Sequence, residues 1–167
     1  MSNISNLIIP RQTVSLVELV DCVCTTVDTV TGLPLCWCGL YPGGVPAWEY
    51  CGECNSGRCG MGYVTMTGAY QTAGLGIPLL DAQCGSYTSL ILKVGVLRCL
   101  PTGDEQGAPP PPDDMADVSM ILFADMLAMK KAILCCYPGD TLLRTYESLP
   151  ASGGCVGGEW TLEIELE

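Results

Sequence analysis

The chain has 167 residues, which suits a single domain able to bury its own core. Its net charge is −11 with only seven basic residues, and this balance argues against tight, specific binding to the phosphate backbone of a nucleic acid. Apolar residues make up 49% and charged residues only 15%, so we expect some of the surface to be buried against other subunits.

The N-terminal residues show no signal for export. Residues 1–12 lack the basic start and the apolar stretch of a signal peptide, and the apolar runs elsewhere are far shorter than the roughly 20 residues of a membrane span. We therefore expect a protein that is made in the cytoplasm and has no membrane partner. In that compartment most of the twelve cysteines are expected to be reduced when the chain folds.

An amphipathic helix is predicted after an irregular arm at residues 1–12. Within residues 15–30 apolar side chains recur at steps of three and four, while acidic side chains lie on the opposite side. Ser15 and Glu18 fit a capping box at the start of this helix. The predicted apolar stripe consists of Leu16, Val20, Val23 and Val27.

A second helix is predicted after a proline-rich acidic loop at residues 101–114. Asp113 and Asp114 would open it, because carboxylates favour the positive end of a helix dipole. Its methionines are interpreted as core side chains rather than as ligands. The predicted apolar stripe consists of Met115, Val118, Leu122, Met126, Met129 and Ile133.

Strands are predicted between the two helices and after the second one, from their β-branched and aromatic content. Residues 141–149 are expected to be a strand or an extended arm, and Gly95 inside the longest strand suggests a bulge or a bend. The predicted segments are residues 35–41, 63–72, 87–100, 141–149 and 160–167.

The final segment alternates between apolar and polar residues without an error. Side chains point to opposite faces of a strand with a period of two, so this pattern predicts a half-buried strand. The face that carries Glu163, Glu165 and Glu167 is expected to be solvated. The face expected to meet the core carries Trp160, Leu162, Ile164 and Leu166.

These elements predict an α+β fold in which two amphipathic helices cover one face of a mainly antiparallel sheet. Residues 13–167 are expected to form one domain behind the arm. Two long loops would interrupt it, a glycine- and cysteine-rich loop at residues 42–62 and the acidic loop at residues 101–114.

The sequence shows no catalytic pattern. It contains no histidine, which removes Ser-His and Cys-His nucleophilic pairs, and no loop that would cradle a phosphate. Every carboxylate has an ordinary interpretation as solvated surface or as the start of a helix. We expect neither an enzyme nor a cofactor.

The cysteines allow several interpretations. Cys22, Cys24, Cys135 and Cys136 fall on the helical patterns and are expected to be small core residues. A second group could supply four thiolates to a structural zinc ion, form disulfides, or hold free thiols. That group consists of Cys36, Cys38, Cys51, Cys54 and Cys59. A zinc site would indicate a small cysteine-rich binding module.

Several stretches resemble the neck proteins of long-tailed phages of actinobacteria, which are tail terminators or head-to-tail connector proteins. The main stretch is SLPASGGCVGGEWTLEIE at residues 148–165, and its block GGCVGGEWT is the most specific part. The others are AWEYCGEC, CGMGYVTM, VGVLRCLP and KKAILCCYP. The resemblance covers about residues 35–167.

The resemblance implies an α+β subunit that assembles into a ring, expected to be a homohexamer. Such a ring caps the tail tube protein, docks to the head-completion or connector protein, and lets genomic DNA pass without sequence-specific binding. The resemblance implies no catalytic residue and no metal. The alternative within the same machine is a head-side connector, or stopper. Either protein would be found in the virion.

An acidic surface suits a channel that DNA slides past without adhering. On this hypothesis the lining consists of Glu163, Glu165 and Glu167, because three carboxylates on one strand face repel each other unless water or counter-charge is near. Asp104 and Glu105 in the acidic loop are the alternative lining.

Overall fold

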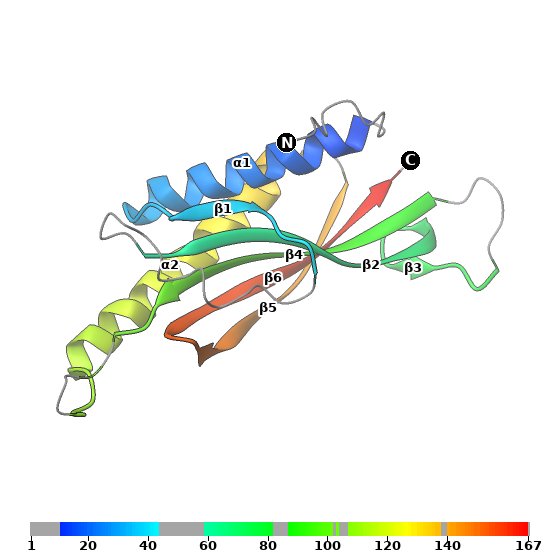
Figure 1. Cartoon of the computed structure of the whole chain (residues 1–167). Coiled ribbons are helices and arrows are strands. Elements are labelled where there is room, and N and C mark those ends of the chain that lie inside the picture. The colour runs from blue at the N-terminus through cyan, green and yellow to red at the C-terminus, as the bar shows by residue number, and fades with distance from the viewer. Residues whose placement is uncertain are drawn as a thin grey trace.

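The computed structural model of the chain describes residues 11–43, 59–81, 87–101, 103, 107–137 and 140–166. These residues form two helices and one six-stranded sheet, which confirms the predicted α+β class. Both helices cover the same face of the sheet, and the strands twist strongly as they cross its centre (Figure 1).

The sheet has the strand order β1-β2-β4-β6-β5, with the short β3 beside the end of β2. β1 runs parallel to β2, and the other described pairs are antiparallel. β1 and β5 are therefore the two edge strands. The elements are α1 (Arg11–Thr31), β1 (Trp37–Leu40), β2 (Met61–Gly74), β3 (Ile77–Pro78), β4 (Tyr87–Cys99), α2 (Pro112–Cys136), β5 (Thr141–Ser152) and β6 (Cys155–Leu166).

Helix α1 buries the predicted stripe but begins earlier than predicted. It starts at Arg11, so the capping box expected at Ser15 and Glu18 is wrong. Ser15 lies inside the helix, where its backbone N–H is past the first turn that a cap would serve. At the other end the Leu35 N–H donates to Asp28 Oδ1 at 2.8 Å and fixes the return of the chain. The buried side chains of α1 are Leu19, Val20, Val23 and Val27.

The main core lies between the helices and the sheet. Leu162 and Ile164 of β6 are fully buried there, and Trp160 packs against them, as the alternation predicted. The Trp160 indole N–H donates to the Met126 carbonyl oxygen at 3.0 Å, which ties β6 to α2. The apolar face of the last strand is thus confirmed as a core face.

Helix α2 is longer than the sheet that it covers. Its second half buries Met129 and Ile133, as predicted, but Met115 at its start is exposed. The beginning of the helix extends past the strands (Figure 1). In the described part of the chain, neither helix combines the length and the hydropathy that crossing a membrane requires.

Gly95 in the centre of the sheet marks a close approach rather than a bulge. The bulge expected at Gly95 is wrong, because the pairing of β2 with β4 continues through this residue. A Cβ atom at Gly95 would collide with the Tyr63 ring, which explains the glycine. The register of β2 shifts instead between Met66 and Gly68.

The glycine pairs around Cys155 have different roles. Gly153 and Gly154 form the turn between β5 and β6, with φ of 56° and 76°, as a tight hairpin turn requires. Gly157 and Gly158 lie inside β6. A Cβ atom on Gly157 would collide with the backbone of β4, and one on Gly158 with the Tyr146 hydroxyl.

Three disulfides join the described elements, and they correct two predictions about the cysteines. Cys22 of α1 is bonded to Cys136 of α2, and Cys24 of α1 is bonded to Cys38 of β1. A third disulfide joins Cys59 to Cys99. Cys22 and Cys24 pack against the main core, as predicted, but the expectation of reduced thiols is wrong for Cys22, Cys24 and Cys136. Cys135 is exposed.

Candidate functional site

The face of β6 that points away from the helices carries the predicted acidic residues. It was expected to be wet, but Glu159 and Glu163 retain only 3% and 1% of their exposure. Each carboxylate has partners on other strands or turns of the sheet. Two polar clusters result, one around Glu163 and one around Glu159.

Glu163 is held by β5 and by the turn between β2 and β3. Arg144 donates to Glu163 Oε2 through Nε at 2.7 Å and through a second guanidinium nitrogen. The Gly76 N–H in that turn donates to the other oxygen, Oε1, at 3.3 Å. The turn therefore reaches from β2 across the sheet to the β5 side.

This arrangement contradicts the expectation that the Glu163 carboxylate is solvated, on which its proposed place in a channel lining depended. The expected repulsion among the strand's carboxylates is relieved here by the Arg144 charge and a backbone donor, and not by water. A buried, neutralised carboxylate presents no charge to a passing polyanion. Arg144 is the residue that sequence reasoning missed, since nothing along the chain indicated that it faces Glu163.

Glu159 belongs to a second cluster on the same face. The Tyr63 hydroxyl donates to Glu159 Oε2 at 2.8 Å, and Lys93 forms an ion pair with Oε1. Lys93 also lies 3.9 Å from the carboxylate of Glu147. Burial raises the pKa of the Tyr63 hydroxyl far above its usual value, and the Glu159 charge raises it further, so Tyr63 stays a proton donor.

Beside this cluster the outer face holds a small core of its own. Met61, Tyr63, Leu97 and Cys155 are buried there, next to the Cys59–Cys99 disulfide. The outer face therefore contributes to the stability of the fold over much of its described area.

The other proposed lining residues are either partly exposed or not described. Glu165 is partly exposed, so its role in a channel stays a prediction. The described residues do not include Glu167, Asp104 or Glu105.

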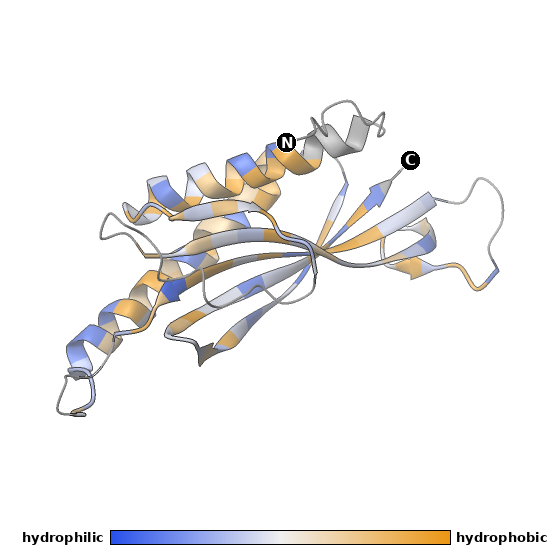
Figure 2. Ribbon diagram, viewed as in Figure 1, coloured by the Kyte–Doolittle hydropathy of each residue, from blue (hydrophilic) through white to orange (hydrophobic). Residues whose placement is uncertain are grey.

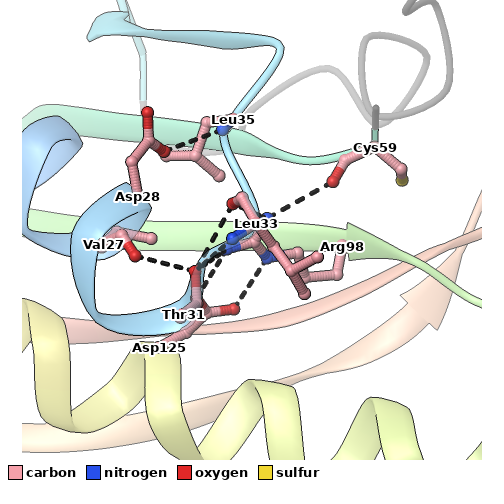
Figure 3. A network of polar contacts seen from close by, with 8 residues as sticks. All are labelled: Val27, Asp28, Thr31, Leu33, Leu35, Cys59, Arg98 and Asp125. Carbon is pink, nitrogen blue, oxygen red and sulfur yellow. Dashed lines mark hydrogen bonds and ion pairs between the residues drawn. The ribbon is translucent and has the colours of Figure 1, made fainter. Parts of the chain in front are cut away.

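A buried ion pair anchors α2 on the opposite, helix-covered face. Arg98 of β4 donates through Nε to Asp125 Oδ2 at 2.9 Å and through Nη2 to Oδ1 at 2.8 Å. Its Nη1 donates to the Leu33 carbonyl oxygen at 2.9 Å (Figure 3). Thr31 and Cys59 also accept hydrogen bonds from this guanidinium. One side chain thus joins the end of α1, β4 and α2.

Asp125 corrects the expectation that every carboxylate is solvated surface or the start of a helix. It is 1% exposed, and Arg98 is 4% exposed. A buried charge is tolerated only when it is paired and hydrogen-bonded, and this pair satisfies both conditions. Its role is to position α2 and α1 on the sheet.

The disulfides also remove most of the proposed zinc ligands. Cys38 and Cys59 are bonded to Cys24 and Cys99, and Cys36 is disulfide-bonded as well, so none of the three offers a thiolate. Cys51 and Cys54 lie outside the described residues. Within the described ranges no group of three or more possible ligands comes together.

Exposed apolar side chains gather in three places on the described surface. The first is the outward side of α2, where orange bands mark apolar residues in Figure 2. The second lies at and after β3, where Leu80 is fully exposed, and the third is the β1 edge. The members are Met120, Phe123, Leu127 and Leu134 on α2, Ile77, Leu79 and Leu80 near β3, and Trp37 and Leu40 on β1.

A groove adjoins the first of these surfaces. It has a volume of about 380 Å³ and lies between α2 and the β5–β6 hairpin. Its apolar walls come from both elements. They include Leu122, Phe123, Met126, Leu149 and Val156.

No protein-family model matches the chain, and no curated protein matches it in sequence.

Proposed function

We propose that the chain is a structural protein of the phage virion, made in the host cytoplasm, that acts in the neck as a tail terminator. Copies of it form a ring that caps the tail tube, joins the tube to the head-completion protein and lets genomic DNA pass. The observation that carries this proposal is the exposure of large apolar side chains at three separate places, on α2, near β3 and along β1. A subunit that contacts several neighbours needs several such surfaces.

The two open sheet edges support the same proposal. A ring subunit contacts its two neighbours through two different surfaces. β1 exposes Trp37 and Leu40 at one edge, and the twelve-residue β5 forms the other, where Leu142 is exposed. An unpaired strand edge of this length can take up a strand from another chain.

The charge distribution is compatible with DNA passage. The net charge is −11, and Lys93, Arg98 and Arg144 already form ion pairs within the subunit. Glu165 remains the described acidic residue of β6 that could face the passage. Few cations are left to hold a phosphate backbone, so DNA would pass without adhering.

The resemblance of the 148–165 stretch to phage neck proteins selects this function among assembly roles. Its glycine pattern has a structural cause here, because the first pair makes a hairpin turn and the second lets β4 and β5 approach β6. The glycine pattern of this stretch therefore serves the fold.

Deleting the gene from a phage that encodes this chain tests the proposal. Loss of a terminator gives overlong tails and separate heads in electron micrographs. Loss of a head-side stopper gives heads that leak DNA beside tails of normal length. Infectious particles of normal form would overturn both assignments.

A further inference from the structure

An apolar stripe runs along the outward side of α2 and has no partner within the described chain. Met120, Phe123 and Leu127 are 68%, 56% and 47% exposed, and Leu134 continues the line at 55%. Their positions follow steps of three, four and seven, which keep side chains on one side of a helix. The stripe lies opposite the buried side of α2, which carries Asp125 and Ala132.

Charged residues flank this stripe in an ordered way. Asp113 and Asp117 lie in the first half of α2, and Lys131 lies in the second half. From position 117 to position 131 the helix makes close to four turns, so these two residues project from the same flank. One flank of the stripe is therefore acidic at one end and basic at the other.

The cations of α2 are unusual within this molecule. Lys93, Arg98 and Arg144 are each engaged in an ion pair inside the subunit. Lys130 and Lys131 are exposed, and among the described side chains they are the cations that take part in no ion pair. A partner for this surface is thus expected to bring carboxylates to them.

We propose that the α2 surface docks a second copy of the chain, with the two α2 helices antiparallel about a two-fold axis near Phe123 and Ala124. Asp117 of each copy then faces Lys131 of the other, and Met120 faces Leu127. A parallel arrangement would instead place Asp117 beside Asp117. The same patch on both copies is self-complementary, as a two-fold interface requires.

The surroundings of the stripe fit this arrangement. The overhanging beginning of α2 leaves its outward side accessible to another helix (Figure 1). The groove between α2 and the β5–β6 hairpin continues the apolar surface on the other flank, and Phe123 lines it. Near the axis the two Phe123 rings meet beside the two grooves. Lys130 lies at the edge of the stripe that borders the groove, where its aliphatic stem can cover apolar surface while its ammonium group stays in water.

This pairing goes beyond the proposed function and does not depend on it. A two-fold pair closes on itself, whereas ring contacts join two different surfaces. The pair is expected in the soluble full-length chain, without any phage component.

The first test measures self-association of the full-length chain by sedimentation and by native mass spectrometry. The wild type is expected to form dimers, and Phe123→Asp is expected to raise the dissociation constant at least about 30-fold, as for loss of a central interface residue. Met66→Asp is the matched control, because Met66 is also exposed, at 59%, but lies on β2. A monomeric wild type, or a dimer that Met66→Asp weakens as much as Phe123→Asp does, would overturn the proposal.

A charge exchange tests the antiparallel arrangement. Asp117→Lys makes both facing positions basic and Lys131→Asp makes both acidic, so each variant alone is expected to associate about 10-fold more weakly at low salt. An equimolar mixture of the two variants restores the attraction and is expected to yield heterodimers at wild-type affinity. A mixture that stays dissociated would overturn this register.

Two further outcomes separate this inference from the proposed function. A ring whose mass is unchanged by Phe123→Asp would reject the α2 contact and leave the neck assignment intact. A two-fold dimer of a chain that is absent from virions would support the α2 contact and reject the neck assignment. Circular dichroism and thermal melting of each variant confirm that the monomer remains folded.

Discussion

One face of β6 packs against two helices, whereas the other is closed by a strand turn and two basic side chains. Leu162 and Ile164 on the first face are fully buried among aliphatic side chains. Glu163, which lies between them in the sequence, is buried to the same degree through Arg144 and the Gly76 N–H. Apolar residues are buried by whatever covers them, while a carboxylate is buried only where specific donors meet it.

The ion pairs of the two faces differ in their own exposure. Asp125 and Arg98, under α2, are both almost completely buried. On the outer face Glu163 and Glu159 are buried, but the side chains of Arg144 and Lys93 keep 46% and 26% of their exposure. Water can therefore solvate the outer pairs in part, and we expect the inner pair to be the more costly one to break.

The largest effect is expected from Arg98→Met. It leaves the Asp125 carboxylate buried without its bidentate partner, and removing one member of such a pair costs about 3–5 kcal/mol. Urea unfolding at neutral pH measures this loss. Asp21→Met, at an exposed position of α1, serves as the control and is expected to change stability by less than about 0.5 kcal/mol. Equal losses in the two variants would contradict the inner burial.

A second comparison uses two carboxylates on the same face of β6. Glu163→Ala removes the acceptor for Arg144 and Gly76 and is expected to cost about 1–3 kcal/mol. Glu165→Ala, two positions further on and partly exposed, is expected to change stability by less than about 0.5 kcal/mol. Urea titrations of both variants measure the two losses of stability. A neutral Glu163→Ala would restore that residue as a solvated candidate for the channel.

The close approach of β4 and β6 gives a third contrast. A methyl group at Gly157 would meet the Val96 carbonyl oxygen and Leu97, so Gly157→Ala is expected to destabilise the fold by about 1–3 kcal/mol. Gly68→Ala is the matched control, because its Cβ would have only an ordinary contact at 3.6 Å with Ile91. Thermal melting of the two variants should therefore differ clearly. Similar melting temperatures would mean that β4 and β6 are less closely paired.

The smallest expected effect is a dependence on alkaline pH. Burial and the Glu159 charge raise the pKa of Tyr63 in the folded chain, whereas the unfolded chain titrates near the ordinary value of about 10. Above that pH the unfolded state loses a proton that the folded state keeps, so stability is full below about pH 10 and falls as pH rises.

Tyr63→Phe removes this contribution. Between pH 10 and pH 11 the wild type is expected to lose about 1 kcal/mol more stability than the variant does. Burial raises the pKa of Tyr146 too, so part of the slope remains in both chains. Urea unfolding at a series of pH values measures the difference. Identical slopes would show that the Tyr63 hydroxyl is solvated.

Local sequence patterns predicted the helices and strands well. The features that were not predicted depend on contacts between residues far apart in the sequence. The steps of three and four in α1 and the alternation in β6 can be recognised from residues close together in the sequence. The structure has a helix and a strand at these places. The partner of Glu163 was not predictable, because the β5–β6 register shifts between Leu143 and Tyr146 and so changes which side chains of the hairpin meet.

The other missed features share this cause. Asp125 looks like a surface residue until Arg98, from a strand before the acidic loop, is placed beneath α2. The Cys22–Cys136 bond joins residues from the two helices, with a separation of 114 positions. The overhang of α2 depends on the size of the sheet, which no single helix pattern encodes.

The assignment to a phage neck is tested most directly by locating the chain in purified virions. Immunogold labelling with an antibody against the folded chain, or electron cryomicroscopy of the junction, gives its position. We predict a ring of this chain between the head and the end of the tail tube. Virions that contain no copy of the chain, or that carry the label only at the distal tip of the tail, would contradict the assignment.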